Sequence, residues 1–345
     1  MSGPFPIGPG SMLRVACALL AACLCTPLPT AAQDQPGPPP ARGRGQLTVD
    51  ALSVVKVRSR AVADARSSQS LGSQREGTGV VIDATGLVLT IGYLVLEAET
   101  VELSTADGRA FPATVVAYDH ATGFGLLRPV GTLPIKPVEF GESAKIAQRE
   151  PVLIVGFDGV APAYVVSRRQ FVGYWEYLLD EAIYTAPVTV NWQGAALLGR
   201  DGKLLGIGSL AVNDAVDAHS QVPGNMFVPI DLLKPLLPEL VARGRPAARP
   251  RPWLGVHTQD VHGNVIVTRV SPGSPADEAA LSTGDVIVGI GGLPVKGQAA
   301  LYTRLWSSGE AGVDIPLDVL RDGRVQSITV RSIARDQYYR PRPTY

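Results

Sequence analysis

The sequence is poor in cysteine and histidine. All three of its cysteines, Cys17, Cys23 and Cys25, lie near the N-terminus. The rest of the chain therefore offers no disulfide, no thiolate metal ligand and no cysteine nucleophile. The four histidines are not spaced as a metal cluster, so the sequence predicts neither a metal nor another cofactor. They are His120, His219, His257 and His262.

The sequence also lacks a surplus of charge of either sign. Its 31 Lys and Arg residues balance 31 Asp and Glu residues, which argues against a nucleic-acid-binding protein. With 345 residues, 46% of them hydrophobic, the chain has room for two or three well-packed domains. Many glycines and prolines (37 and 29) beside few aromatic residues indicate short strands joined by turns.

The N-terminal segment 1–32 has the pattern of an export signal. Arg14 precedes an apolar run from Val15 to Cys25, and a small-residue cleavage site ends at Ala32. The apolar run is short for a permanent membrane span. We therefore expect an exported protein, with the bacterial periplasm as its location. An alternative is that the four residues ending at Cys23 act as a lipobox, so that a lipidated Cys23 anchors the protein to a membrane.

Composition divides the rest of the chain into two domains. A Pro/Gly-rich linker at 33–46 precedes a first domain at 47–242. A basic, Pro-rich linker at 243–252 leads to a second domain at 253–333. The sequence predicts a flexible tail at 334–345.

Short apolar segments separated by turn residues predict a mainly β protein, with barrels or sandwiches in preference to βαβ units. Helices are predicted at 231–241, with Asp231 as N-cap, and at 299–306. The predicted strands of the first domain include 53–58, 79–82, 86–90, 101–104, 113–118, 151–156, 182–186 and 204–210, and those of the second include 265–270, 285–290, 315–320 and 327–330.

The segment GTGVVIDATGLVLT, residues 77–90, resembles the first barrel of trypsin-like proteases of the HtrA/Deg family. The resemblance implies a chymotrypsin-like double β-barrel followed by a PDZ domain. In the family this strand leads to a turn that carries the catalytic histidine, and Tyr93 stands there. A second family stretch matches at Asp119 and Thr122, but Gly123 occupies the position of the catalytic aspartate.

Residues 191–207 resemble the family segment that carries the nucleophilic serine. The Leu-Leu, Asp-Gly and Gly-Ile matches place Gln193 on the serine, and Asn191 on a glycine of the oxyanion loop. Loss of the nucleophile or base alone costs about 10⁶ in turnover in a comparable enzyme. The resemblance therefore implies a pseudoprotease, with Tyr93, Gly123 and Gln193 in the three catalytic positions.

Two neighbouring features leave alternatives open. Trp192 either plugs the former cleft or serves as an aromatic binding platform. His219 and Ser220 offer displaced catalytic groups, so a serine endopeptidase or hydrolase with a displaced site is the alternative function. The segment from Asn225 to Pro229 resembles the strand that lines the substrate pocket in the family, and a core strand is its simpler interpretation.

The second domain resembles the PDZ domain of the same family over its whole length. The residues Trp253, Leu254, Gly255 and Val256 match the loop that binds a peptide carboxylate through backbone N–H groups. The resemblance places the last peptide side chain against a helix at Ala300, Leu301 and Leu305.

The resemblance thus implies a protein that binds polypeptide C-termini or unfolded segments. It would act as an adaptor, a chaperone-like factor or a regulator of a related active protease, and a homotrimer is the oligomer it implies. A third possibility is a structural assembly protein whose PDZ domain packs on the first domain and binds no free peptide.

Overall fold

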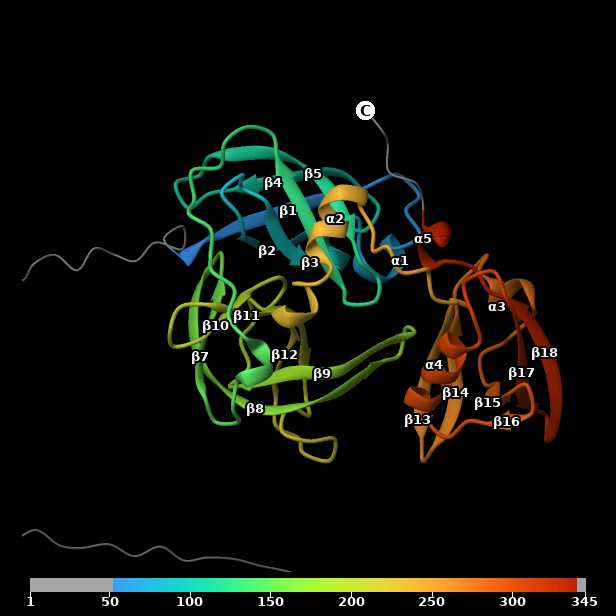
Figure 1. Ribbon diagram of the computed structural model, residues 1–345. Coiled ribbons are helices and arrows are strands. Elements are labelled where there is room, and N and C mark those ends of the chain that lie inside the picture. Colours follow the sequence, from blue (N-terminus) through green and yellow to red (C-terminus); the bar gives the residue numbers. More distant parts are fainter. Residues whose placement is uncertain (1–51, 340–345) are drawn as a thin grey trace, which may run out of the picture. The chain divides into compact units, whose positions relative to one another are not determined.

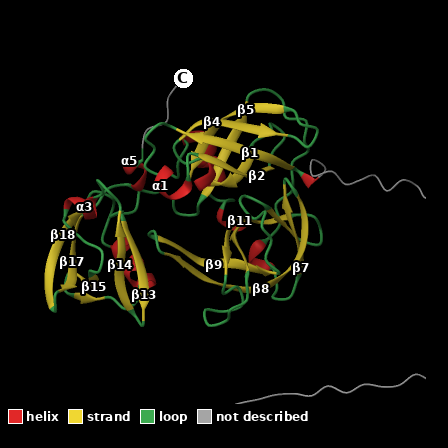
Figure 2. Cartoon of the chain, turned by 180° about the vertical axis from the view of Figure 1, so that it is seen from behind, coloured by secondary structure: helices red, strands yellow, loops and turns green. Residues whose placement is uncertain are grey.

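The computed structural model describes residues 52–339. The predicted export signal with Cys23, and the linker at 33–46, lie outside these residues. Within the described part, no helix is long and apolar enough to cross a membrane. Strands predominate throughout (Figures 1 and 2), which confirms the predicted mainly β class.

The first barrel closes in the strand order β1-β2-β3-β6-β5-β4. From Val57 to Ala61, β1 alternates buried and exposed residues, as expected of a strand with one face on a core. Closure leaves no sheet edge unpaired. The strands are β1 (Val54–Ala61), β2 (Gln74–Val81), β3 (Val88–Ile91), β4 (Ala98–Ser104), β5 (Ala110–Tyr118) and β6 (Phe124–Pro129), with α1 (Ser68–Leu71) between β1 and β2 and the 3-10 helix η2 (Gly92–Leu94) after β3.

The second barrel closes in the order β10-β11-β12-β9-β8-β7. Its β8 and β9 form a long hairpin that extends beyond the other strands (Figure 1). One apolar core cluster runs through both barrels. The strands are β7 (Pro151–Gly156), β8 (Gly159–Gly173), β9 (Tyr177–Ala186), β10 (Ala196–Leu198), β11 (Leu204–Val212) and β12 (Gly224–Pro229), and the 3-10 helix η3 (Ser143–Lys145) precedes β7.

The third sheet has the order β13-β14-β15-β17-β18, with β16 paired to β15, and has its own apolar core. Because β13 is an edge strand, one of its sides has no strand partner within this sheet. The elements are β13 (Val256–Val261), β14 (Asn264–Val270), α3 (Pro275–Glu278), β15 (Val286–Ile290), β16 (Leu293–Pro294), α4 (Gln298–Ser307), β17 (Asp314–Arg321) and β18 (Arg324–Arg331). The helix predicted at 299–306 is confirmed as α4.

The helix predicted at 231–241 is wrong in its first half. The chain there forms the 3-10 helix η4 (Ile230–Leu232), and an α-helix, α2 (Leu237–Arg243), begins only near Pro238. Proline favours the first turn of a helix and disrupts its interior, and the chain has two prolines in this segment. Asp231 does not cap α2, because its carboxylate accepts a hydrogen bond from Ala144 N–H at 2.7 Å.

Part of the predicted flexible tail is ordered. Residues Arg335–Tyr338 form helix α5, and the Tyr338 hydroxyl donates to the carbonyl of Pro272 at 3.0 Å. The Tyr338 ring also lies 4.7 Å from that of Trp253. Aromatic packing therefore holds residues 335–338 in place, although the sequence predicted a flexible tail there.

Gly194 allows the loop before β10 to approach the first barrel. Its φ is +74°, and an added Cβ would lie 2.0 Å from the carbonyl oxygen of Thr78. Gly202 has a similar φ of +76°, but nothing lies within 4 Å of its Cβ position. The two glycines therefore separate the effect of backbone conformation from that of steric contact.

We expect Gly194→Ala to reduce the free energy of unfolding by about 3 kcal/mol or more, since it adds a steric clash to an unfavourable φ. Gly202→Ala has only the φ penalty and should cost about 1 kcal/mol. Urea unfolding of both variants measures the difference. Equal losses would show that the approach of the loop to Thr78 is not a tight contact.

Candidate functional site

Tyr93 is held in place at both its backbone and its side chain. It lies in η2, directly after β3, and its hydroxyl donates to the carbonyl of Ser209 on β11 at 2.8 Å. Its own carbonyl accepts a hydrogen bond from the Arg75 guanidinium at 3.0 Å. Burial raises the pKa of the Tyr93 phenol well above its usual value. A phenol that stays protonated and donates to a carbonyl cannot remove a proton from a nucleophile at neutral pH.

Gly123 adopts a left-handed conformation in the turn before β6, with φ +84°. Its carbonyl accepts the N–H of Gly92 at 2.7 Å, which joins this turn to η2. The Tyr177 hydroxyl, from β9, donates to Thr122 O at 2.6 Å. An added Cβ at Gly123 would lie only 3.3 Å from that hydroxyl. The side-chain space beside Gly123 is therefore partly filled by Tyr177.

Gln193 contacts the first barrel through its backbone. Its carbonyl accepts the N–H of Thr78 at 2.8 Å. An added Cβ at Gly77 would lie 2.7 Å from this carbonyl and 2.5 Å from the side chain of Leu94 in η2. The segments that carry Tyr93 and Gln193 thus meet at Gly77. The fold therefore brings together the three regions singled out from the sequence.

Trp192 lies in the same loop, and its indole nitrogen is buried. The Nε1–H lies near Tyr93 and opposes the rise in the pKa of that phenol, yet it makes no hydrogen bond of normal geometry to any described residue. The Trp192 carbonyl packs so closely on β11 that a Cβ at Gly208 would lie 1.9 Å away. The Trp192 side chain is only half-buried, and its buried indole nitrogen agrees better with a plug than with an aromatic platform open to a ligand.

The alternative catalytic residues do not form a pair. His219 is exposed, and the hydroxyl of Ser220 donates to the carbonyl of Asp217 at 2.9 Å. The His120 ring packs against the ring of Tyr118 at 4.3 Å. The carboxylate of Asp119 accepts the N–H and hydroxyl of Thr122, which stabilises a turn. Among the described residues, no three His, Cys, Asp or Glu side chains cluster as metal ligands.

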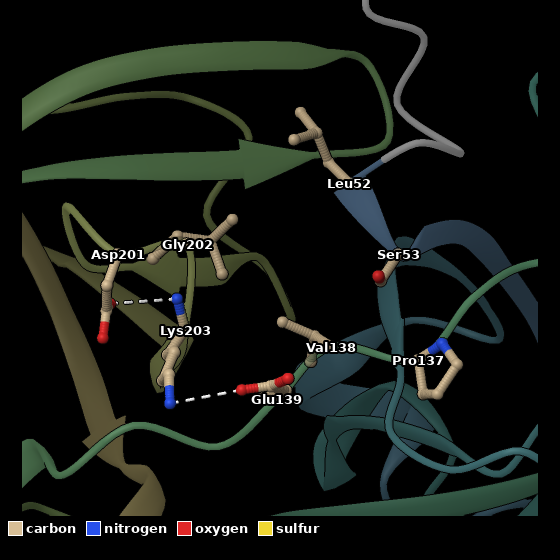
Figure 3. A pocket seen from close by; sticks show the side chains of 9 residues that line it. Leu52, Ser53, Pro137, Val138, Glu139, Asp201, Gly202 and Lys203 are labelled. Carbon is tan, nitrogen blue, oxygen red and sulfur yellow. Dashed lines mark hydrogen bonds and ion pairs between the residues drawn. The ribbon is translucent and has the colours of Figure 1, made fainter.

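A pocket of about 350 Å³ lies elsewhere, where the start of β1 meets the segment near Glu139 and the turn before β11 (Figure 3). Its charged groups are paired with each other. Lys203 Nζ lies 3.2 Å from the Glu139 carboxylate, and its backbone N–H donates to Asp201 at 3.1 Å. Tyr93, Gly123 and Gln193 do not line it, so we assign it no role in catalysis.

The loop of the third sheet predicted to bind a carboxylate holds one. The backbone N–H groups of Leu254, Gly255 and Val256 donate to the carboxylate of Glu176, at 3.1, 2.7 and 3.0 Å. Glu176 lies in the turn of the β8–β9 hairpin and is 4% exposed. At Gly255 φ is +89°, and a Cβ would lie 2.3 Å from Ser274. Only glycine therefore fits this loop.

The residues proposed to contact a peptide side chain lie in different surroundings. Leu301 and Leu305 are part of the core of the third sheet, whereas Ala300 is exposed. Trp253 forms a bridge with Ile333. The sequence did not single out Tyr302, yet its hydroxyl donates to Gly173 O at 2.9 Å. This contact joins α4 to the end of β8.

Comparison with protein families and known proteins supports both domains. A model of the trypsin-like peptidase domain matches residues 77–207, and a PDZ domain model matches 252–331. The putative serine protease HhoA of Synechocystis sp. is 28% identical over 288 residues, which are 74% of this chain and 70% of that protein. The periplasmic pH-dependent serine endoprotease DegQ of Escherichia coli is 25% identical, over 74% of this chain and 58% of that protein.

The chain is therefore a homologue of the HtrA-family serine proteases. It spans between 56% and 71% of the lengths of such curated relatives. The solved HtrA-type protease AlgW, described with a decapeptide, aligns with a TM-score of 0.50 and 20% identity over 85% of this chain and 97% of that protein, and so supports the fold alone.

In this HtrA-family homologue, the third sheet thus lies within the matched PDZ domain. The loop Leu254–Val256 is the one that the sequence predicts to bind a peptide carboxylate. No sequence motif predicted a binding role for Glu176. The only local signal in the sequence is a cluster of aromatic residues around a lone glutamate, Tyr174-Trp175-Glu176-Tyr177. The structure shows why these residues are together: the Trp175 ring stacks on that of Tyr177 at 5.5 Å and shapes the turn.

The titration of Glu176 follows from its surroundings. Burial raises the pKa of its carboxyl to about 7, while the three N–H donors and the charge of Arg335 oppose this rise. Neighbouring groups do not titrate in the same range, because burial raises the pKa of Tyr302 to about 12 and lowers that of His257 to about 4. Glu176 is therefore the group expected to titrate here between pH 5 and 8.

This raised pKa predicts a pH-dependent contribution to stability. The folded state binds the proton of Glu176 more tightly than the unfolded chain does, so the contribution is full below pH 4.5 and is lost as the pH rises through about 7. The shift corresponds to about 3 kcal/mol. Glu176→Gln does not titrate at this position. The difference in unfolding free energy between wild type and this variant should therefore fall by that amount between pH 4.5 and 8. Parallel curves would contradict the assignment.

Proposed function

We propose that this protein is a non-catalytic, exported HtrA-like protein that binds polypeptide C-termini or extended segments through its PDZ domain. It would act as an adaptor, a chaperone-like factor or a regulator of a related active protease, and as a homotrimer in the manner of the family. The observation that carries the proposal is the set of side chains at the catalytic positions: Tyr93, Gly123 and Gln193.

The chemistry of a serine protease needs a nucleophile, a base and a group that orients the base. The amide of Gln193 cannot replace a hydroxyl, and the phenol of Tyr93 stays protonated. Gly123 has no side chain to orient a base, and Tyr177 occupies part of the space beside it. Restoring the family residue at any one of these three positions would leave two of the three catalytic roles unfilled. This supports a loss of protease activity that involves the whole site.

The PDZ domain supports the binding half of the proposal. Three successive N–H groups converge on one carboxylate, which is the geometry that captures a chain terminus. The proposed export of the protein is supported by the pattern of its N-terminal segment and by its similarity to the periplasmic endoprotease DegQ. Anchoring through Cys23 would add a membrane attachment to the same function.

A fluorophosphonate probe with intact-mass detection tests the loss of catalysis. We expect no stoichiometric labelling, because no serine is paired with a base at the site, and no cleavage of casein above background. Trypsin provides the positive control.

Labelling that is stoichiometric, and that Ser220→Ala or Ser209→Ala abolishes, would overturn the proposal in favour of a hydrolase with displaced catalytic residues. Labelling that persists in both variants at trace level would indicate a contaminating protease and leave the expected result in place.

A further inference from the structure

The carboxylate-binding loop of the PDZ domain is filled by the chain itself. Glu176 places its carboxylate where three N–H groups converge, at 2.7 to 3.1 Å for its shorter contacts. A polypeptide C-terminus would present the same group to the same donors. Each N–H can serve only one of the two carboxylates well, so the two ligands compete.

The competition extends along the edge of the sheet. A bound peptide adds as a strand beside β13, whose outer edge has no strand partner in the PDZ sheet. The N–H of Val256 is taken by Glu176, and that of Thr258 donates to the carbonyl of Tyr174 at 2.9 Å. The Thr258 carbonyl accepts from the side chain of Gln298 at 2.7 Å. The backbone groups that would bind a peptide strand are thus already used.

Tyr302 holds the same turn from the side of α4. Its hydroxyl donates to Gly173 O at 2.9 Å and accepts the N–H of Glu176 at 3.3 Å. Val172 and Leu178, on either side of the turn, pack against the core of the PDZ domain. The hairpin turn therefore contacts the loop, the edge strand and the helix, which are the three elements that form a PDZ groove.

Glu176 also adopts a conformation that is unfavourable for its residue type. Its φ of +55° lies in the left-handed region, which costs a residue with a Cβ about 1 kcal/mol or more. The contacts with the loop offset this cost. A strained, non-glycine residue that is buried against a binding loop is typical of a functional position.

We infer that the turn of the β8–β9 hairpin is an internal ligand of the PDZ groove, and that a polypeptide C-terminus binds there only after it displaces Glu176. This inference rests on the proposed peptide-binding function and names its regulation. A tethered ligand acts at an effective concentration of the order of millimolar, so it suppresses binding of free peptides strongly.

The hairpin also connects the groove to the former catalytic region. Glu176 binds the PDZ loop, while the next residue, Tyr177, donates to Thr122 O beside Gly123. Displacement of the turn by a peptide therefore reaches the position that the resemblance assigns to the catalytic aspartate. Peptide binding and the packing around Gly123 are coupled through two adjacent residues.

Glu176→Gly tests the inference, because glycine keeps the positive φ without strain and removes only the side chain. The probe is an octapeptide library with its last four residues randomised and a free C-terminal carboxylate, compared with the same library amidated at the C-terminus. We expect Glu176→Gly to bind the free-carboxylate library about tenfold more tightly than wild type, or better, and neither protein to bind the amidated library.

Glu181→Ala is the matched control, since this glutamate lies on β9 and is exposed on the same hairpin. It should bind as wild type does. Equal affinity of wild type and Glu176→Gly for the free-carboxylate library would overturn the inference while leaving the proposed peptide-binding function intact.

A second readout separates the inference from the proposed function. Chymotrypsin cleaves after aromatic residues, and Tyr174 and Trp175 lie in the turn. Docking should protect the turn in wild type and Glu181→Ala, and Glu176→Gly should be cut there at least tenfold faster. If neither protein binds peptides but this difference is seen, the internal contact stands and the peptide-binding function fails. Equal cleavage would contradict the internal contact itself.

Discussion

The turn of the β8–β9 hairpin connects the two parts of this protein that could carry function. A buried carboxylate is costly unless hydrogen bonds compensate for lost hydration. Glu176 obtains part of this compensation from three N–H groups of the PDZ loop, which in turn gain an acceptor, although burial still raises its pKa. The next residue, Tyr177, fills the space beside Gly123. The proposed PDZ groove and the region around Gly123 are therefore joined by two adjacent residues of one turn.

The contacts of the three residues proposed to stand in the catalytic positions are also mutually consistent. The Tyr93 phenol spans from η2 to β11, and the loop with Trp192 and Gln193 packs on the first barrel through close glycine contacts. An imidazole at position 93 is shorter than a phenol and would lose the bond to Ser209 O. In the proposed non-catalytic protein, these contacts stabilise the barrels, whereas an active site keeps polar groups available for the transition state.

Much of this architecture could be predicted from the sequence. The short apolar segments predicted a mainly β protein, and the resemblance to the HtrA/Deg family implied the double barrel. The Leu-Leu, Asp-Gly and Gly-Ile matches placed Gln193 in its loop. Among the strands that the sequence did not predict are β8 and the first half of β9. Arg168 and Arg169 interrupt the apolar pattern in β8, and many of its residues are exposed or half-buried, so hydrophobic periodicity is weak there. The sequence also did not predict that Glu176 binds the PDZ loop, because a glutamate in a turn is ordinarily exposed to solvent. Its partner lies 79 positions away at Gly255, and only the tertiary structure brings them together.

Amide hydrogen exchange at the carboxylate-binding loop tests the central claim most directly. In wild type, the N–H groups of Gly255 and Val256 donate to Glu176, so both should exchange slowly when no peptide is present. In Glu176→Gly, both should lose protection, while core amides such as that of Val267, which donates to Asp285 O, keep theirs. Fast exchange at Gly255 and Val256 in the wild-type protein would contradict the account, because the groove would then be open.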